Sequence, residues 1–233
     1  MDYNFDIGII GAMDPEVNEL VARLENKVSE TVGTVTYHAG TLLGKRVVIA
    51  KCGIGKVFAA ICTQTMILKY SPSLIVNTGV GGAAALGLSP LDVVIADKLV
   101  QHDMDTSAIG DPKGLVSGIN VIYFESDPHA VEVLSNAATA MGVSHRIGTI
   151  ATGDKFVSSL DEKNRINGDF GACACEMEGC SVAQVAYVND VKFAVVRAIS
   201  DSADGSACME YSKFLPEAAR ISTALTLSLV ENY

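Results

Sequence analysis

The sequence predicts an α/β protein built as a three-layer α-β-α sandwich around a central mixed, twisted sheet. Short runs rich in Val and Ile, bounded by Gly, alternate with longer segments of helical periodicity along the 233 residues. Nearly continuous apolar strands are typical of sheets that helices cover on both faces. One segment, residues 34–51, instead places two β-like runs around Leu43-Gly44-Lys45, as an antiparallel hairpin would. The sheet is therefore expected to be mixed rather than purely parallel.

The alternation runs through the whole chain. Short apolar runs predict strands, and longer segments with apolar residues on one helical face predict helices. No linker or repeat divides the series, so we expect residues 1–233 to form a single domain. The predicted strands are 5–10, 46–50, 74–77, 93–96, 146–151 and 193–199. The predicted helices are 14–26, 55–69, 128–141, 178–189 and a final one over about 211–231.

Composition and charge restrict the classes of function. Hydrophobic residues make up 49% of the chain and charged residues 19%, enough for a substantial core, which excludes an intrinsically disordered protein. The 17 basic and 27 acidic side chains give a net charge of −10, so nucleic acid and membrane surfaces are not expected partners. The six cysteines lie mostly in apolar runs and are expected to be reduced. Without a signal-like or membrane-spanning run, we expect a cytoplasmic protein.

Three glycine-rich segments follow predicted strands and are expected to form turns: Gly8 to Met13, Gly53 to Lys56, and Gly79 to Gly82. Turns at strand ends let a ligand approach backbone amides closely. None matches a nucleotide fingerprint, because the first lacks the G-x-G-x-x-G spacing and Val57 stands where a Walker motif needs Ser or Thr. Each segment alone has an ordinary explanation as a tight connection. Together they predict a shared ligand crevice.

Three carboxylates occupy positions where an α/β sheet places its ligands. Glu16 follows the first strand in Asp14-Pro15-Glu16, which is also the pattern of an N-cap, a first helical residue and a first-turn acid. Glu178 opens a predicted helix, where it also has a purely stabilising explanation. Asp201 directly follows a long apolar run, so it is expected at the carboxyl end of a buried strand.

These acids suit the cleavage of a bond to an anomeric carbon. The oxocarbenium-like transition state of that reaction needs a protonated leaving group and an activated water. A metal site is the rival chemistry, but the four His are dispersed and no H-x-x-E or D-x-D-x-D-G pattern is present. The Cys173-x-Cys175-x4-Cys180 run lacks a second ligand pair for zinc, and no Cys or Ser has a visible His partner. We therefore expect no metal.

Six ordered blocks give the chain a resemblance to a known family over nearly its whole length. It resembles the bacterial 5′-methylthioadenosine/S-adenosylhomocysteine nucleosidases, in the purine nucleoside phosphorylase-like superfamily. The resemblance implies a nucleoside phosphorylase-like fold and irreversible hydrolysis of the N-glycosidic bond of adenosine thioethers to adenine and a thioribose, without metal or organic cofactor. The matching blocks are Gly8 to Met13 with Glu16, Cys52 to Val57, Asn77 to Gly79, Gly153 to Phe156, Glu176 to Glu178, and Val196 to Asp201.

The resemblance assigns a role to each carboxylate. It implies that Glu16 positions and deprotonates the water, that Asp201 donates a proton to the seven-position nitrogen of adenine, and that Glu178 holds the ribose hydroxyls. The local chemistry agrees, because adenine leaves poorly as an anion and protonation of its five-membered ring should matter most. Asp201 then needs a pKa raised by burial or by neighbouring negative charge. A carboxylate at Glu178 would also favour the cation that develops on the ribose.

The family pattern further implies which residues contact each part of the nucleoside. Phe156 lies against the purine face, backbone groups of Val157 contact the purine edge, and Met177 lies under the ribose. Ser200 and Arg197 would orient Asp201 and Glu178. The complete implied substrate site contains Met13, Ile54, Gly79, Val80, Phe156, Val157, Glu176, Met177, Arg197, Ser200 and Tyr211. The apolar thioalkyl end would be enclosed by Met13, Ile54 and Tyr211. Taken singly, Ile54, Phe156 and Met177 are also explained as plain core residues.

Two features depart from the family pattern. Val80 stands where relatives commonly carry a small polar residue. The segment 106–112 lacks the aromatic-rich composition often seen there; it belongs to an irregular stretch, residues 101–118, that is alternatively an ordinary mobile loop. By the resemblance, the chain forms a homodimer in which Thr106 and Ile109 of this stretch reach the neighbouring subunit's pocket. The preferred 5′ substituent, thioalkyl or deoxy, stays open.

Three alternative functions share the predicted scaffold. A phosphate-dependent purine nucleoside phosphorylase is the nearest, but phosphate would need arginines at the first glycine segment, where this chain presents Asp14 and Glu16. An aminofutalosine-type nucleosidase would act on a related nucleoside. A non-catalytic nucleoside-binding module would keep the pocket without the chemistry, yet all three carboxylates are present.

Overall fold

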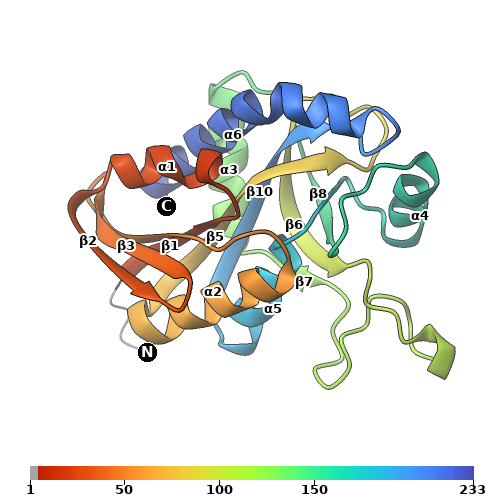
Figure 1. Cartoon of the computed structure of the whole chain (residues 1–233), viewed down its shortest axis with the longest axis horizontal. Helices are drawn as coiled ribbons and strands as arrows, with labels where there is room; N and C mark the ends of the chain where they lie inside the picture. Colours follow the sequence, from red (N-terminus) through yellow and green to blue (C-terminus); the bar gives the residue numbers. More distant parts are fainter. Residues whose placement is uncertain (1–4) are drawn as a thin grey trace.

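In the part of the chain that the structure describes, ten strands form the central sheet, and helices cover both of its faces (Figure 1). The computed structural model describes residues 5–233. The strands are β1 (Phe5–Gly11), β2 (Glu25–Val32), β3 (Val35–Leu42), β4 (Lys45–Lys51), β5 (Pro72–Ala83), β6 (Val93–Gln101), β7 (Phe124–Glu125), β8 (His145–Thr152), β9 (Ala174–Glu176) and β10 (Lys192–Asp201). The helices are α1 (Asp14–Ala22), α2 (Lys56–Tyr70), α3 (Pro128–Ala140), α4 (Leu160–Phe170), α5 (Gly179–Val188) and α6 (Ala207–Asn232), with a short 3-10 helix, η1 (Ser107–Ile109).

The sheet is mixed, as predicted, and part of it closes on itself. β1 lies parallel between β4 and β5, and the antiparallel strands β3 and β2 continue outward from β4. β5 is twelve residues long and pairs with β1, β10 and β9. Because β10 also pairs with β6, β6 with β8 and β8 with β9, these strands form a closed ring with β5. The ring brings the ends of β5, β9 and β10 around one space.

Two helical layers pack on opposite faces of the sheet. α2 packs against α5 on one face, and α6 packs against α1 and α3 on the other. Met66 and Cys180 belong to the buried cluster of the first layer, and Leu20, Leu134 and Leu225 to that of the second. This arrangement confirms the predicted α-β-α sandwich. Among residues 5–233, no helix combines the length and the apolar character that crossing a bilayer requires.

The hairpin predicted around Leu43-Gly44-Lys45 is confirmed. Leu42 pairs with Lys45, which leaves Leu43 and Gly44 as a two-residue turn with φ angles of 52° and 82°. Positive φ at both central residues matches the twist of the paired strands.

The first helix is shorter than predicted. The helix predicted over 14–26 ends at Ala22, and the prediction is wrong beyond that residue because Glu25–Val32 forms β2. β2 is an exposed edge strand rich in charged and polar residues, so its sequence shows no alternation of apolar and polar positions. The start also differs from the prediction, since Met13 rather than Asp14 is the N-cap residue.

Besides β2, the elements β7, β9 and α4 were not predicted from the sequence. β7 and β9 are two and three residues long, too short to show a period. α4 is strongly polar and contains Gly168, which weakens its helical pattern. Its start is fixed by Ser159, whose side chain accepts a hydrogen bond from the N–H of Glu162. α4 packs against β8, one of the strands of the ring.

Candidate active site

A cavity of about 240 Å³ lies at the ends of β1, β5, β9 and β10. All three predicted catalytic carboxylates line it: Glu16 from α1, Glu178 from the start of α5, and Asp201 from the last position of β10. This is the edge at which α/β sheets place their ligands. The predicted substrate-site residues that also line the cavity are Met13, Ile54, Val80, Phe156, Val157, Glu176, Met177, Ser200 and Tyr211.

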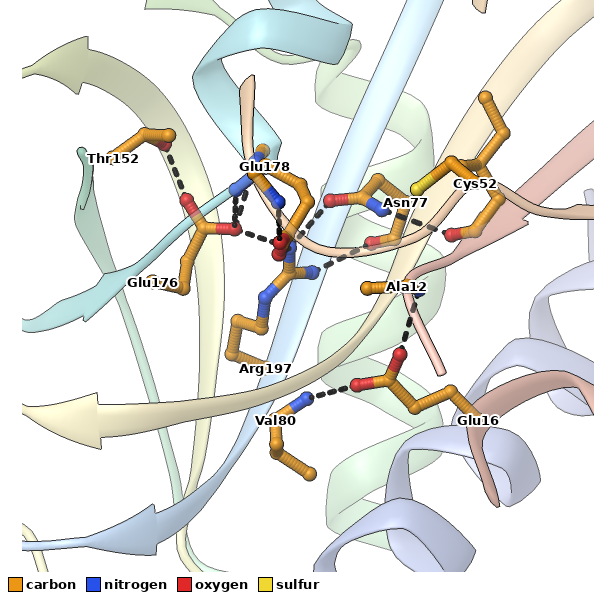
Figure 2. Close-up of polar contacts among 12 residues, drawn as sticks. Ala12, Glu16, Cys52, Asn77, Val80, Thr152, Glu176, Glu178 and Arg197 are labelled. Atoms are coloured by element: carbon orange, nitrogen blue, oxygen red, sulfur yellow. Dashed lines mark hydrogen bonds and ion pairs between the residues drawn. The ribbon is translucent and has the colours of Figure 1, made fainter. Parts of the chain in front are cut away.

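Three backbone N–H groups hold the buried carboxylate of Glu16, and Figure 2 shows those of Ala12 and Val80. Its Oε2 accepts hydrogen bonds from Ala12 N at 2.7 Å and Met13 N at 2.9 Å, and its Oε1 accepts from Val80 N at 3.1 Å. Burial raises the pKa of Glu16, although the Arg197 charge and these hydrogen bonds act in the opposite direction. Glu16 also lies in the first turn of α1, so its helix-stabilising role coexists with its place in the cavity.

The third glycine-rich segment is a strand rather than a turn. Gly79 to Gly82 lies within β5, so the predicted turn is wrong there, and Gly8 to Gly11 likewise belongs to β1. A Cβ on Gly79 would overlap Glu16 Oε1, and a Cβ on Gly82 would lie 2.9 Å from Asp201 Oδ1. The glycines of β5 therefore let two carboxylates lie directly against the strand backbone.

Arg197 is buried below the cavity and balances part of its negative charge. Its Nη2 donates hydrogen bonds to Glu176 Oε2 and Asn77 Oδ1, and its Nη1 donates to the carbonyl oxygen of Asn77 at 3.2 Å. Glu178 Oε2 lies 3.9 Å from Nη2, so the predicted contact between Arg197 and Glu178 is an ion pair rather than a hydrogen bond. Burial lowers the pKa of Arg197, but the surrounding carboxylates, Glu176 first, outweigh burial and raise it.

Glu176 and Glu178 are separated by one residue but have different surroundings (Figure 2). The Thr152 hydroxyl and Arg197 both donate hydrogen bonds to Glu176. Glu176 Oε2 also accepts from the N–H groups of Glu178 at 3.0 Å and Gly179 at 2.7 Å, at the start of α5. Both carboxylate oxygens of Glu176 are thus engaged by protein donors, which makes it an anchor of the site.

Glu178 is held less completely. Its Oε1 accepts a hydrogen bond from Gly55 N at 2.8 Å. Among the described residues, no donor lies within hydrogen-bond distance of its Oε2, which leaves that oxygen available to a ligand hydroxyl. Burial and then the neighbouring Glu176 charge raise the pKa of Glu178, against the effects of Arg197 and of the Gly55 hydrogen bond.

Asp201 is buried at the end of β10, and each of its oxygens has one donor. The Ser200 hydroxyl donates to Oδ2 at 2.8 Å, and Ala203 N donates to Oδ1 at 2.9 Å. Burial raises the pKa of Asp201; these two hydrogen bonds lower it, and the charges of Glu210 and Asp204 raise it again. The net shift is upward, which is the direction that a proton donor near neutral pH requires.

Apolar side chains form the other part of the cavity wall. The rings of Phe156 and Tyr211 meet edge to face, with centroids 5.6 Å apart and an angle of 80°. The Tyr211 hydroxyl donates to Met13 Sδ at 3.2 Å. Ile54 and Phe156 are 54% and 40% exposed, so the explanation of these two as plain core residues is wrong. The cavity therefore has an acidic part and an apolar part.

Four predicted site residues lie outside the cavity wall. Gly79 is packed behind Glu16, and Arg197 is buried below the acids. Thr106 precedes η1 and Ile109 is its last residue, in a segment that projects away from the body of the molecule (Figure 1). The Ile109 side chain is 83% exposed.

The wall also contains residues that were not predicted. Most of them lie inside the quoted sequence blocks or glycine-rich segments, so proximity to those motifs was the available signal. Cys175 is the exception, and burial raises the pKa of its thiol to about 12, which makes the thiol unreactive. The additional wall residues are Ala12, Gly81, Gly82, Lys155 and Cys175.

Comparisons with known proteins agree with this geometry. The family model described as the phosphorylase superfamily matches residues 6–231. A 5′-methylthioadenosine/S-adenosylhomocysteine nucleosidase from Haemophilus influenzae (strain PittEE) is 39% identical over 226 residues, which span 97% of this chain and 98% of that protein.

Solved structures resemble the fold over its full extent. The same enzyme from Neisseria meningitidis, in complex with methylthio-immucillin-A, matches with a TM-score of 0.95 at 34% identity and covers 98% of this chain and 99% of its own. A futalosine hydrolase of Helicobacter pylori strain 26695 matches with a TM-score of 0.93 at 33% identity, over 99% of each chain. The chain therefore belongs to the 5′-methylthioadenosine/S-adenosylhomocysteine nucleosidase family of the phosphorylase superfamily.

Proposed function

We propose that this protein hydrolyses the N-glycosidic bond of 5′-methylthioadenosine and S-adenosylhomocysteine, and releases adenine and the corresponding thioribose. The observation that carries the proposal is the convergence of Glu16, Glu178 and Asp201 on one cavity. Relatives that bear the name of this activity match nearly the whole chain, which supports the same chemistry here.

Asp201 is the general acid of the proposed reaction. Protonation of the seven-position nitrogen of adenine lets the base leave as a neutral molecule when its bond to the anomeric carbon breaks. The raised pKa of Asp201 keeps the proton available near neutral pH. The Ser200 hydroxyl and the Ala203 N–H then stabilise the carboxylate that remains after the proton has been transferred.

Glu16 and Glu178 act on the sugar side of the same bond. A water bound at Glu16 attacks the anomeric carbon; the new C–O bond forms as the C–N bond breaks, and a proton of the water passes to Glu16. The three backbone N–H groups on Glu16 favour its carboxylate form, which the proton acceptor needs. Glu178, with Oε2 available, hydrogen-bonds the ribose hydroxyls. In its carboxylate form, which the Arg197 charge and the Gly55 N–H favour, it stabilises the developing cation.

The charge of the cavity favours water over phosphate as the nucleophile. Glu16 stands where an incoming phosphate would approach the sugar, and the two anions would repel each other. Among the described residues of the wall, the only cation is Lys155, whose Nζ pairs with Glu162 Oε2 at 2.7 Å. Arg197 is occupied by Glu176 and Asn77. These contacts support a hydrolase rather than a phosphorylase.

The apolar part of the cavity supports an alkylthio group at the 5′ position. Met13, Ile54 and Tyr211 supply apolar surface and a thioether contact there. The departure at Val80 leaves its backbone N–H bond to Glu16 intact, because that bond does not depend on the side chain. The likeness to a futalosine hydrolase makes an aminofutalosine-type nucleoside the second candidate substrate.

We also propose a homodimer that works in the cytoplasm. A stripe of apolar side chains on α2 supports the dimer: Val57, Ile61 and Leu68 are 68%, 55% and 73% exposed and lie on one helical face. The exposed Ile109 segment is then available to reach the partner's pocket. All six cysteines are free thiols, which supports a reducing compartment. Light scattering tests the dimer, and a fully active monomer would rule out a shared site.

Adenine release from a panel of nucleosides tests the proposed reaction. The panel contains 5′-methylthioadenosine, S-adenosylhomocysteine, 5′-deoxyadenosine and an aminofutalosine-type nucleoside, each with and without inorganic phosphate. We expect adenine from the first two at rates that do not change when phosphate is omitted. Strict dependence on phosphate would assign a phosphorylase instead, and release from the aminofutalosine-type nucleoside alone would assign the second candidate substrate.

A further inference from the structure

Two charged side chains from different helices hold the backbone around Ser202, the residue after Asp201. Lys163 Nζ, on α4, donates a hydrogen bond to the Ser202 carbonyl oxygen at 2.7 Å. Ser202 N donates to Glu210 Oε2, on α6, at 2.7 Å. The peptide groups on both sides of Ser202 are therefore fixed, one by a cation and the other by an anion.

The segment that these contacts hold has a disfavoured conformation. Ala203 has a φ of 50°, in the left-handed region that a residue with a Cβ rarely adopts. This conformation accompanies the hydrogen bond from Ala203 N to Asp201 Oδ1 at 2.9 Å. Strained residues persist only where the surrounding structure holds them, and here Lys163 and Glu210 supply that hold.

Lys163 is unusual among the lysines near α4. Its side chain is buried, with the whole residue only 8% exposed, and within residues 5–233 no carboxylate lies within ion-pair distance of its Nζ. By contrast, Lys155 and Lys113 are exposed and pair with carboxylates on α4. Burying a cation without a counterion is unfavourable. The hydrogen bond of Lys163 goes instead to the Ser202 carbonyl oxygen, and its charge acts on Asp204 in the same segment.

We propose that Lys163 and Glu210 are positioning residues of this enzyme, which hold Ser202 so that the Ala203 N–H stays on Oδ1 of Asp201, while Oδ2, beside the Ser200 hydroxyl, delivers the proton. The inference rests on the proposed nucleosidase reaction, because it acts through the general acid of that reaction. Neither side chain lines the cavity, so neither needs to touch the nucleoside.

The two residues should affect the acidity of Asp201 in opposite directions. The Glu210 charge raises the pKa of Asp201, so its removal lowers that pKa. The Ala203 N–H bond lowers the pKa of Asp201, so releasing the segment by removal of Lys163 raises it. The titratable groups that face Asp201 are Asp204 in the following turn, Glu210 and Tyr211 on α6, and Cys175 on β9.

The test compares Lys163→Met and Glu210→Gln in the full-length enzyme, by adenine release from 5′-methylthioadenosine across pH. For Glu210→Gln we expect the alkaline limb of kcat to move to lower pH by about half a unit, the size of one charge effect at high effective dielectric. For Lys163→Met we expect kcat to fall about tenfold with a smaller change in KM, because the acid is misplaced, and the alkaline limb to move upward. Lys163→Arg keeps the cation and should recover most of kcat.

Matched controls lie on α6. Lys213→Met removes a cation and Glu217→Gln an anion from exposed positions on the same helix that carries Glu210, and both should leave kcat and its pH limb unchanged. Thermal unfolding checks that each variant is folded. If Lys163→Met is not folded, the shift of the alkaline limb of the kcat–pH profile in Glu210→Gln decides the test.

The inference is overturned if the two limbs move in the same direction, if Glu210→Gln leaves the limb in place, or if a folded Lys163→Met keeps the kcat of the unmodified enzyme. If the unmodified enzyme itself releases no adenine, the proposed function fails instead. The two failures are therefore distinguishable.

Discussion

The backbone N–H of Gly55 donates a hydrogen bond of 2.8 Å to Oε1 of Glu178, and this contact joins the turn after β4 to the start of α5. Gly55 has a φ of 101°, and a Cβ there would lie 3.1 Å from Asp154 Oδ1. Asp154 in turn accepts a hydrogen bond from Lys56 N at 2.7 Å. Only glycine brings this N–H to Glu178 without strain and without displacing the segment that leads to Phe156.

Gly55→Ala should therefore weaken the hold on the ribose. The added Cβ shifts the turn, removes the only N–H donor to Glu178 in the described part of the chain, and leaves this carboxylate free to turn away from the sugar. We expect kcat/KM for 5′-methylthioadenosine to fall at least about tenfold, since a hydrogen bond to a charged group contributes roughly 1.5–3 kcal/mol. Steady-state kinetics of adenine release measure this loss.

Gly44→Ala is the matched control for Gly55→Ala. Gly44 has a φ of 82° in the β3–β4 hairpin, and a Cβ there meets no atom within 4 Å. The control should lose stability through the same backbone strain and keep its kcat/KM. Equal kinetic losses in the two variants would mean that the Gly55 effect is general destabilisation.

Asp201→Asn should separate binding from chemistry. The amide keeps the size of the side chain but cannot supply the acid proton, so we expect kcat to fall by about 10²–10⁴-fold while the nucleoside still binds. Calorimetric titration with 5′-methylthioadenosine measures binding, and adenine release measures turnover. Asp161→Asn on the exposed first turn of α4 is the control for loss of a carboxylate. Unchanged turnover in Asp201→Asn would show that Asp201 is not the general acid.

Much of the fold could be predicted because its central strands are apolar on both faces. Runs such as Val47 to Ala50 and Phe193 to Ile199 are buried throughout, and their composition alone marks them as strands. β2 was not predicted because it is an edge strand whose side chains face solvent rather than the core. The turn predicted for Gly79 to Gly82 is wrong. Glycine indicates a turn in most sequences, whereas here it makes room for carboxylates beside a strand.

The carboxylates of the site could be predicted because each stands at a boundary between elements, where α/β folds place ligand-binding residues. The different roles of these carboxylates could not be predicted. Glu176 and Glu178 differ only in which donors the fold brings to them, from β8, β10 and the turn at Gly55. The contact between Lys163 and Ser202 joins residues 39 apart in sequence and depends on α4, a helix without a clear period.

Arg197→Met should destabilise the protein strongly. The substitution leaves Glu176 and Glu178 buried beside each other without their common cation, and removal of one partner from a buried ion pair costs roughly 3–5 kcal/mol. Guanidinium unfolding measures the change. Arg220→Met, on the exposed face of α6, removes an ion pair with Glu217 and should leave the unfolding free energy nearly unchanged. A small loss in Arg197→Met would mean that the acids are protonated and do not need the cation.

The raised pKa of Glu178 predicts a pH dependence of stability. In the unfolded chain this group titrates near 4.5, and in the folded protein its pKa is raised to about 8, so the folded state binds more protons between these values. The contribution of Glu178 to stability is therefore lost as pH rises through this window, by at most about 1.4 kcal/mol for each pH unit. Glu178→Gln removes the titration and should flatten the fall in unfolding free energy from about pH 5 to about pH 8, measured by urea unfolding. Glu217→Gln, which removes an exposed carboxylate, should follow the slope of the unmodified protein, and an equally steep slope in Glu178→Gln would show that Glu178 is already charged at low pH.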